Sequence, residues 1–133
     1  MGRSQTALMG EFRKLRVWNK AHALSIDVDQ IAKKIRGGVY APLRSQMVRA
    51  AMSIPANLAE GCVQKTPKDF ARFVGYSIGS AAELENHLMI ARDVKGISDA
   101  DYHRATTELT GVRMMLHGLS KRLKERSSLS DNG

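Results

Sequence analysis

The sequence predicts an all-α protein that folds as an antiparallel up-down-up-down four-helix bundle. Apolar residues recur at steps of three and four in four separate segments, and short segments with glycine or proline divide these segments. Only 5% of the residues are aromatic, so the core must consist mainly of Leu, Ile, Val, Met and Ala, as helix-on-helix packing prefers. No segment has the pattern of a strand. Four amphipathic helices with short connections pack most simply as such a bundle.

The length of 133 residues fits a single domain with its own core. We expect the bundle to occupy residues 13–126. A flexible N-terminal segment should precede it at 1–12, and the Ser-rich residues 127–133 are expected to form a disordered tail.

The first two helices are predicted on either side of a break at Gly37, Gly38 and Pro42. One apolar row ends near Arg36, and the other ends near Gly61. The first row is Val17, Ala21, Leu24, Val28, Ile31 and Ile35, and the second is Leu43, Met47, Ala50, Ile54 and Leu58. Pro55 falls inside the second helix, where a proline costs roughly 3 kcal/mol because a backbone donor is lost. Another interaction must offset this cost.

The third and fourth helices begin at recognisable caps. Thr66 precedes Pro67 and stands three residues before Asp69, which resembles a capping box, and Ser98 stands at the start of the fourth helix. Gly96 is expected to be a left-handed C-cap between the two helices. Their apolar rows are Phe70, Phe73, Ser77, Ala81, Leu84, Leu88 and Ala91, then Tyr102, Ala105, Leu109, Val112, Leu116, Leu119 and Leu123.

Composition restricts the compartment and the class of partner. The single cysteine, Cys62, excludes an internal disulfide framework and suits a reducing compartment, where we expect it to fill a small space in the core. The sequence shows no secretory leader and no apolar run near 18 residues, so we expect a soluble cytoplasmic protein without a membrane partner. The net charge of +8 favours polyanions such as nucleic acid.

Antiparallel helix order predicts that most of this charge gathers at one end of the bundle. Only Glu11, Glu60, Asp69 and Glu125 oppose the eleven cations there, which leaves a net charge of +7. The cations are Arg13, Lys14, Arg16, Lys20, Lys65, Lys68, Arg72, Lys121, Arg122, Lys124 and Arg126.

Two interpretations of these cations are possible. Those near the C-terminus could merely complement the macrodipole of the last helix, but this does not explain the cations at the start of the first helix. The combined end therefore favours binding to the phosphate backbone of RNA or DNA. No aromatic row interleaves the cations to stack bases, so binding should depend steeply on salt and little on sequence.

A polar stripe runs along the second helix, roughly 110° from its apolar row. Its members are Gln46, Arg49, Ser53, Asn57, Glu60 and Gln64. The stripe could be an ordinary solvated face. Alternatively, Arg49, Asn57 and Glu60 could be satisfied across a subunit contact, or around the carbonyl of Ala51 that the proline frees.

Small residues form a line on the third helix at Ala71, Gly75, Gly79 and Ala82, although each helical glycine costs about 1 kcal/mol relative to alanine. This pattern suggests close backbone approach, either inside the bundle or between subunits. Trp18 lies off the main row of the first helix, where it could anchor an interface or pack at the edge of the core.

No catalytic pattern emerges. The histidines His22, His87, His103 and His117 lack ligand spacing, and Gly75 and Gly79 do not belong to a phosphate loop. A nucleophile motif is also missing. We expect no enzyme activity, no metal and no cofactor.

Three sequence phrases resemble those of a known family. Ser53–Gly61 reads SIPANLAEG, Lys14–Ala21 reads KLRVWNKA and Gly79–Glu85 reads GSAAELE. Together they resemble the small four-helix proteins encoded in intervening sequences of bacterial 23S rRNA genes, over about residues 12 to 124. Related members include the accessory variability protein of diversity-generating retroelements, which partners a reverse transcriptase. Val48 and Met52 depart from the family pattern, and Val48 thins any basic patch on the second helix.

The resemblance implies a homopentamer with a basic surface and suspected nucleic-acid binding. In that reading, Arg49, Ser53, Pro55, Asn57, Glu60 and Gly61 form a structural or interface motif, with Gly75, Gly79 and Trp18 as further interface candidates. The alternative function is a protein-interaction scaffold without a nucleic-acid role, for example an accessory subunit of a reverse transcriptase.

Overall fold

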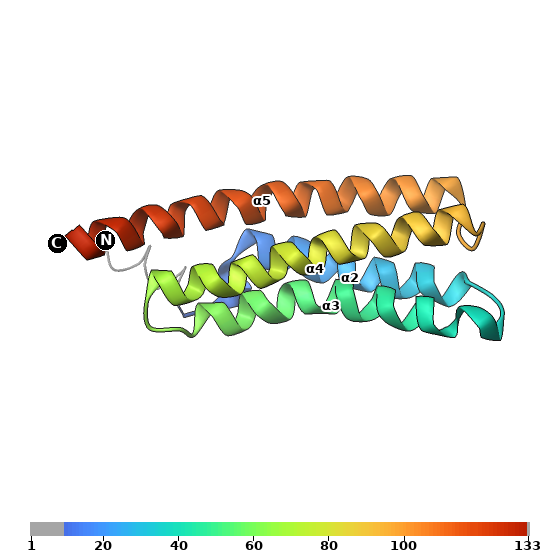
Figure 1. The fold of residues 1–133 in the computed structure, drawn as a ribbon, viewed down its shortest axis with the longest axis horizontal. Coiled ribbons are helices and arrows are strands. Elements are labelled where there is room, and N and C mark those ends of the chain that lie inside the picture. Colours follow the sequence, from blue (N-terminus) through green and yellow to red (C-terminus); the bar gives the residue numbers. More distant parts are fainter. Residues whose placement is uncertain (1–9, 133) are drawn as a thin grey trace.

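Four long helices form the fold of the computed structural model, which describes residues 10–132 and their side chains as far as residue 129. They are α2 (Arg16–Lys34), α3 (Ala41–Cys62), α4 (Pro67–Asp93) and α5 (Asp99–Asn132), with short 3₁₀ helices η1 (Phe12–Lys14) and η2 (Gly38–Tyr40) (Figure 1). Helix α3 packs against α2 and α4, and α5 packs against α4 and α2. The predicted up-down-up-down bundle is confirmed, and residues 10–132 contain no strand. None of these helices is long and apolar enough to cross a membrane.

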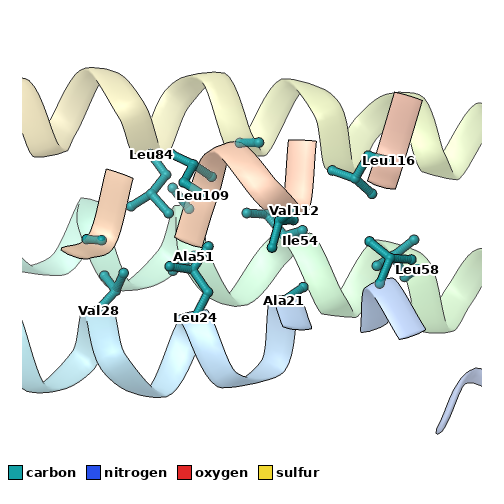
Figure 2. Close-up of a cluster of buried hydrophobic side chains, with 14 of the residues drawn as sticks. Ala21, Leu24, Val28, Ala51, Ile54, Leu58, Leu84, Leu109, Val112 and Leu116 are labelled. Atoms are coloured by element: carbon teal, nitrogen blue, oxygen red, sulfur yellow. The ribbon is translucent and has the colours of Figure 1, made fainter. Parts of the chain in front are cut away.

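The predicted apolar rows form the core where the four helices meet (Figure 2). Every member of the α2 row is buried, and Leu43 and Tyr102 are half-buried at the ends of the α3 and α5 rows. One position was wrong: Phe73 is only half-buried, and Val74 is fully buried in its place. Both choices satisfy a 3.6-residue period between Phe70 and Ser77, so the rotation of α4 against its neighbours decided between them.

The helix caps follow the sequence prediction. The Thr66 hydroxyl accepts a hydrogen bond from the Asp69 amide at 3.1 Å, and the Ser98 hydroxyl accepts one from the Asp101 amide at 3.0 Å. Each hydroxyl satisfies one of the amides that the first turn of a helix leaves unpaired.

The two ends of the chain differ from the expectation of flexible segments. Helix α5 continues through Asn132, so the structure shows helix across most of the segment expected to be a disordered tail at 127–133. At the other end, Phe12 belongs to η1 and packs against the core, so the ordered region begins before residue 13. The rest of the expected flexible segment, residues 1–9, lies outside the described residues.

The end of α4 corrects the predicted position of the left-handed residue. Lys95 has a φ of +61°, whereas Gly96 is not in the left-handed region. The Gly96 amide donates to the Ala91 carbonyl at 2.8 Å, and the Lys95 amide donates to the Arg92 carbonyl at 2.9 Å. These two bonds define a Schellman motif in which Lys95 takes the position that glycine usually occupies.

Gly61 is the glycine that allows two helices to approach closely. A Cβ atom built on Gly61 would lie 2.7 Å from Cδ1 of Phe70 and 3.0 Å from Cβ of Phe73. Phe70 is fully buried, so its ring has little room to move away. The last turn of α3 can therefore pack on the first turn of α4 only if residue 61 has no side chain.

Gly61→Ala should destabilise the protein by about 1–3 kcal/mol, because the added methyl group overpacks a filled core. Gly111→Ala is the matched control, since no heavy atom of the chain lies within 4 Å of a Cβ built there. We expect it to leave stability unchanged or raise it by up to about 1 kcal/mol through helix propensity. Urea unfolding followed by circular dichroism measures both variants. Equal effects of the two substitutions would contradict the close packing at Gly61.

Lys95→Gly should stabilise the protein by about 0.5–1 kcal/mol, because a left-handed backbone strains a residue with a side chain but not glycine. Thermal unfolding of this variant tests the expectation. Lys68→Gly is a useful comparison, because it removes a lysine from the first turn of a helix and should not stabilise. A lower stability of Lys95→Gly would show that the Lys95 conformation carries no strain.

Candidate nucleic-acid interface

The eleven cations predicted to share one end lie on segments that meet there. Figure 1 shows the start of α2, the α3–α4 connection and the C-terminal part of α5 at the same end of the molecule. All of these cations are exposed except Arg126, which is half-buried. We call this set the basic end. Its members come from η1 and α2 (Arg13, Lys14, Arg16, Lys20), from the α3–α4 connection and α4 (Lys65, Lys68, Arg72), and from α5 (Lys121, Arg122, Lys124, Arg126).

Most of the basic end has no carboxylate partner among the described side chains. Arg13 pairs with Glu11 at 3.0 Å, and Arg72 lies 4.0 Å from Asp69. The other nine cations form no ion pair with the side chains described through residue 129. Their charge is therefore open to an external anion.

Several cations toward the opposite end of the bundle are paired within the fold. Lys34 donates to Asp101 at 3.0 Å, and Arg104 bridges Asp101 and Asp27, both at 3.0 Å. The hydrogen bonds from Lys34 and then Arg104 lower the pKa of Asp101. The Lys34–Asp101 and Arg104–Asp27 pairs join α2 to α5 and engage two of the thirteen acidic side chains of the chain. By contrast, most cations of the basic end have no carboxylate partner among the described side chains.

A cleft between α4 and α5 brings cations of the basic end together from two helices. It encloses about 490 Å³, and its lining includes Lys68 and Arg72 of α4 with Lys124 of α5. Ser127 and Ser128 supply two hydroxyls from α5. The N-terminus of α4 also lies at this cleft, and its dipole favours negative charge. Sequence reasoning missed the two serines, because the segment that carries them was expected to be disordered.

Two aromatic side chains accompany Arg72, although no aromatic row runs among the cations. The Arg72 guanidinium lies 4.9 Å from the ring centre of Phe73 and 6.0 Å from that of Tyr76. It also donates to the Tyr76 hydroxyl at 3.4 Å. Tyr76 is 49% exposed, so its ring is accessible beside the cation. The signal was present in the sequence, because residues 72 and 76 are one helical turn apart.

The polar stripe of α3 is satisfied locally. The Ser53 hydroxyl donates to the Ala50 carbonyl at 2.9 Å, and the Asn57 amide group donates to the Ser53 carbonyl at 2.8 Å. Arg49 and Glu60 are exposed. The described hydrogen bonds thus do not form the expected network around the Ala51 carbonyl.

Pro55 is buried within an uninterrupted α3, and a hydrogen bond from another helix lies next to it. The fully buried Ser77 of α4 donates to the carbonyl of Ile54, the residue before the proline, at 2.8 Å. Ser77 stands in the apolar row of α4, so the sequence spacing predicted that it is buried. The spacing did not predict that its hydroxyl bonds to the Ile54 carbonyl. This bond joins the two helices at the position of the proline.

The other interface candidates occupy different surfaces. Gly75 and Gly79 are exposed, and no heavy atom of the chain lies within 4 Å of a Cβ built at either one. This excludes close packing of these glycines inside the bundle. Trp18 is half-buried at the edge of the core, stacked on His22 and tilted against Phe12.

The described residues offer no metal cluster or activated thiol. No group of three or more His, Cys, Asp or Glu side chains within the described part of the chain could hold a metal ion. Cys62 is buried in the core, as predicted, and burial raises the pKa of its thiol to about 11. A thiol with such a pKa is almost fully protonated at neutral pH and is a poor nucleophile.

Comparison with known proteins identifies the family. The family model described as 23S rRNA-intervening sequence protein matches residues 13–118, which is most of the chain. This chain belongs to that family. The match covers α2, α3, α4 and more than half of α5, and it confirms the predicted family resemblance.

A solved structure shares the fold of this family member. It is a protein of unknown function from the S23 ribosomal protein family of Bacteroides thetaiotaomicron, with a TM-score of 0.71 and 19% sequence identity. The likeness covers 79% of this chain and 95% of that one. A comparison with curated proteins finds no match. At this identity, the likeness supports the four-helix fold alone.

Proposed function

We propose that this 23S rRNA-intervening sequence protein is a non-catalytic, oligomeric protein of the cytoplasm that binds the phosphate backbone of nucleic acid through its basic end. The observation that carries the proposal is the α4–α5 cleft, where Lys68, Arg72 and Lys124 converge from two helices. Three cations around one cleft suit a phosphate group, and Ser127 and Ser128 add hydrogen-bond donors. Asp69 is the one carboxylate in the lining, and it accepts a hydrogen bond from the Thr66 hydroxyl at 2.9 Å.

Lys121 extends this surface beyond the cleft, because it lines a neighbouring pocket together with Lys124 and Ser128. Unpaired cations release condensed counterions from the nucleic acid when they bind, which is the main source of affinity for a phosphate backbone. Tyr76, held beside Arg72, gives one exposed ring on which an unstacked base could lie. The family name refers to intervening sequences of 23S rRNA, so structured RNA is the first ligand to test.

Reversal of Lys68, Arg72 and Lys124 to glutamate should weaken binding to structured RNA and duplex DNA by about tenfold or more at low salt. The slope of log affinity against log salt concentration should also become shallower by about 2 to 3, because three phosphate contacts are lost. Gel-shift titrations of both nucleic acids at two salt concentrations measure these effects.

The matched control reverses Lys33, Arg36 and Lys95, which changes the net charge equally at the opposite end of the bundle. We expect this control to alter the affinity only slightly and to leave the salt slope unchanged. If the unmodified protein retards neither nucleic acid at low salt, the proposed function is wrong. Equal losses in the two variants would show that net charge, and not the cleft, governs binding.

A second candidate is a protein-interaction scaffold, and the outer face of α4 favours it. Gly75 and Gly79 leave the backbone bare on this face, while Met89, Ile90 and Val94 are exposed further along the helix. Glycine lowers the stability of a helix, so glycines that contact nothing in their own chain need another reason. Close packing of another chain on this face would supply it. This face suits contacts between copies in the homopentamer that the family resemblance implies, or contacts with a reverse transcriptase.

Gly79→Leu should disrupt the oligomer, because a branched side chain would hold the neighbouring subunit away from the α4 backbone. Size-exclusion chromatography with light scattering measures the mass. Thr110→Leu adds the same side chain to an exposed position of α5 and should leave the mass unchanged. An unchanged mass in Gly79→Leu would exclude the α4 face as the subunit contact.

A further inference from the structure

A groove runs along the seam between α2 and α5, on a different side of the bundle from the α4–α5 cleft. Two adjoining cavities of about 740 and 490 Å³ form it, and both are lined by Arg16, Met114 and Met115. The larger cavity extends to Lys20 and Glu108, and the smaller one extends to Arg122. We call this feature the α2–α5 groove.

Apolar groups and bare backbone line the α5 side of the groove. Met114 is 71% exposed, and Met115 is half-buried against the core. Gly111 and Gly118 lie seven residues apart, so they share one face of α5. A Cβ built on Gly111 would meet no heavy atom within 4 Å, and one on Gly118 would meet only the Arg122 side chain at 3.6 Å. The backbone of α5 is therefore open to close approach from outside.

Positive charge borders this apolar strip on both helices. Arg16 and Lys20 project from α2 and Arg122 from α5, and none of them forms an ion pair with a described side chain. The neighbouring carboxylate of Asp27 is already held by two hydrogen bonds from Arg104, at 3.0 and 3.3 Å. The three cations thus keep their charge for a ligand.

The carboxylates of Asp27 and Glu108 lie at the far end of the groove. Burial, followed by the nearby charge of Asp27, raises the pKa of the Glu108 carboxyl group. Between Arg16 and Asp27 the α2 wall is about 16 Å long, or roughly three helical turns. The groove is therefore elongated, apolar along α5 and basic at one end.

We propose that the α2–α5 groove binds an acidic amphipathic helix of a partner protein. The apolar row of that helix would pack on Met114 and Met115, and its carboxylates would pair with Arg16, Lys20 and Arg122. Methionine side chains adapt to varied partners, and helix-in-groove recognition relies on such apolar anchors. Complementary charge would fix the register and the direction of the bound helix.

The chemistry of the groove favours this ligand over two others. A nucleic-acid backbone offers no apolar row to cover the exposed methionine. Contacts between copies are assigned above to the outer face of α4, which leaves this groove free for a different partner. The inference does not rest on the nucleic-acid proposal, because the cations of the α4–α5 cleft do not line this groove.

A synthetic peptide tests the proposal with the full chain. The probe is a labelled peptide of about four helical turns, with leucine along one face and glutamate on both flanks. Fluorescence anisotropy should show saturable binding. A scrambled peptide of identical composition, which lacks the apolar face, should bind at least about tenfold more weakly. Arg16→Glu combined with Lys20→Glu should weaken binding of the first peptide by about tenfold or more.

Two exposed methionines provide a matched pair of variants. Met114→Asp should lower the affinity for the peptide by about tenfold or more, whereas Met52→Asp, at a 57% exposed position in a separate pocket, should not change it. Both sites are exposed, so neither substitution should unfold the protein. Reversal of Lys68, Arg72 and Lys124 should leave peptide binding within about threefold, which separates this site from the nucleic-acid site.

Four results would overturn the proposal. They are equal binding of the scrambled peptide, unchanged affinity in Met114→Asp, a smaller oligomer in Met114→Asp by light scattering, and loss of RNA binding in Met114→Asp. The third would assign the groove to a second copy of the chain, and the fourth would assign it to nucleic acid.

Discussion

Burial of the four apolar rows in one core is the constraint on which the rest of the structure depends. Each helix has one apolar face, and the bundle buries all four together. Once these faces point into the core, each flank of a helix lies beside one particular neighbouring helix. The flank of α2 that carries Arg16 and Lys20 then lies beside α5, and the flank that carries Trp18 lies toward α3. Surface features are consequences of this single packing arrangement.

The same arrangement separates paired from unpaired charge. Packing of α2 against α5 brings Asp27 within reach of Arg104 and Lys34 within reach of Asp101, so these four charges pair away from the basic end. Surface ion pairs such as these contribute little stability individually. Unpaired cations remain where α2 begins and α5 ends. The proposed nucleic-acid function depends on this distribution.

Cations of the basic end serve two chemically different surfaces. Lys68, Arg72 and Lys124 surround a polar cleft with hydroxyl groups, which suits phosphate. Arg16 and Arg122 border an apolar groove, which suits a helix that carries both apolar and carboxylate side chains. A family member with both surfaces could hold RNA and a protein partner together. The α4–α5 cleft and the α2–α5 groove lie on different flanks of α5, so one ligand need not displace the other.

The sequence by itself determined the number of helices, their order, their caps at Thr66 and Ser98, and nearly all of the core. These features depend on local spacing and local hydrogen bonding, which a linear pattern records. Tertiary structure alone decided that Val74 is buried instead of Phe73, that Gly61 needs to be glycine, and that Gly75 and Gly79 face outward. It also placed Ser77 on the carbonyl before Pro55 and formed the α2–α5 groove. Each of these depends on how one helix is rotated and set against another, because residues on the flank of a helix gain their role only from the neighbour they meet.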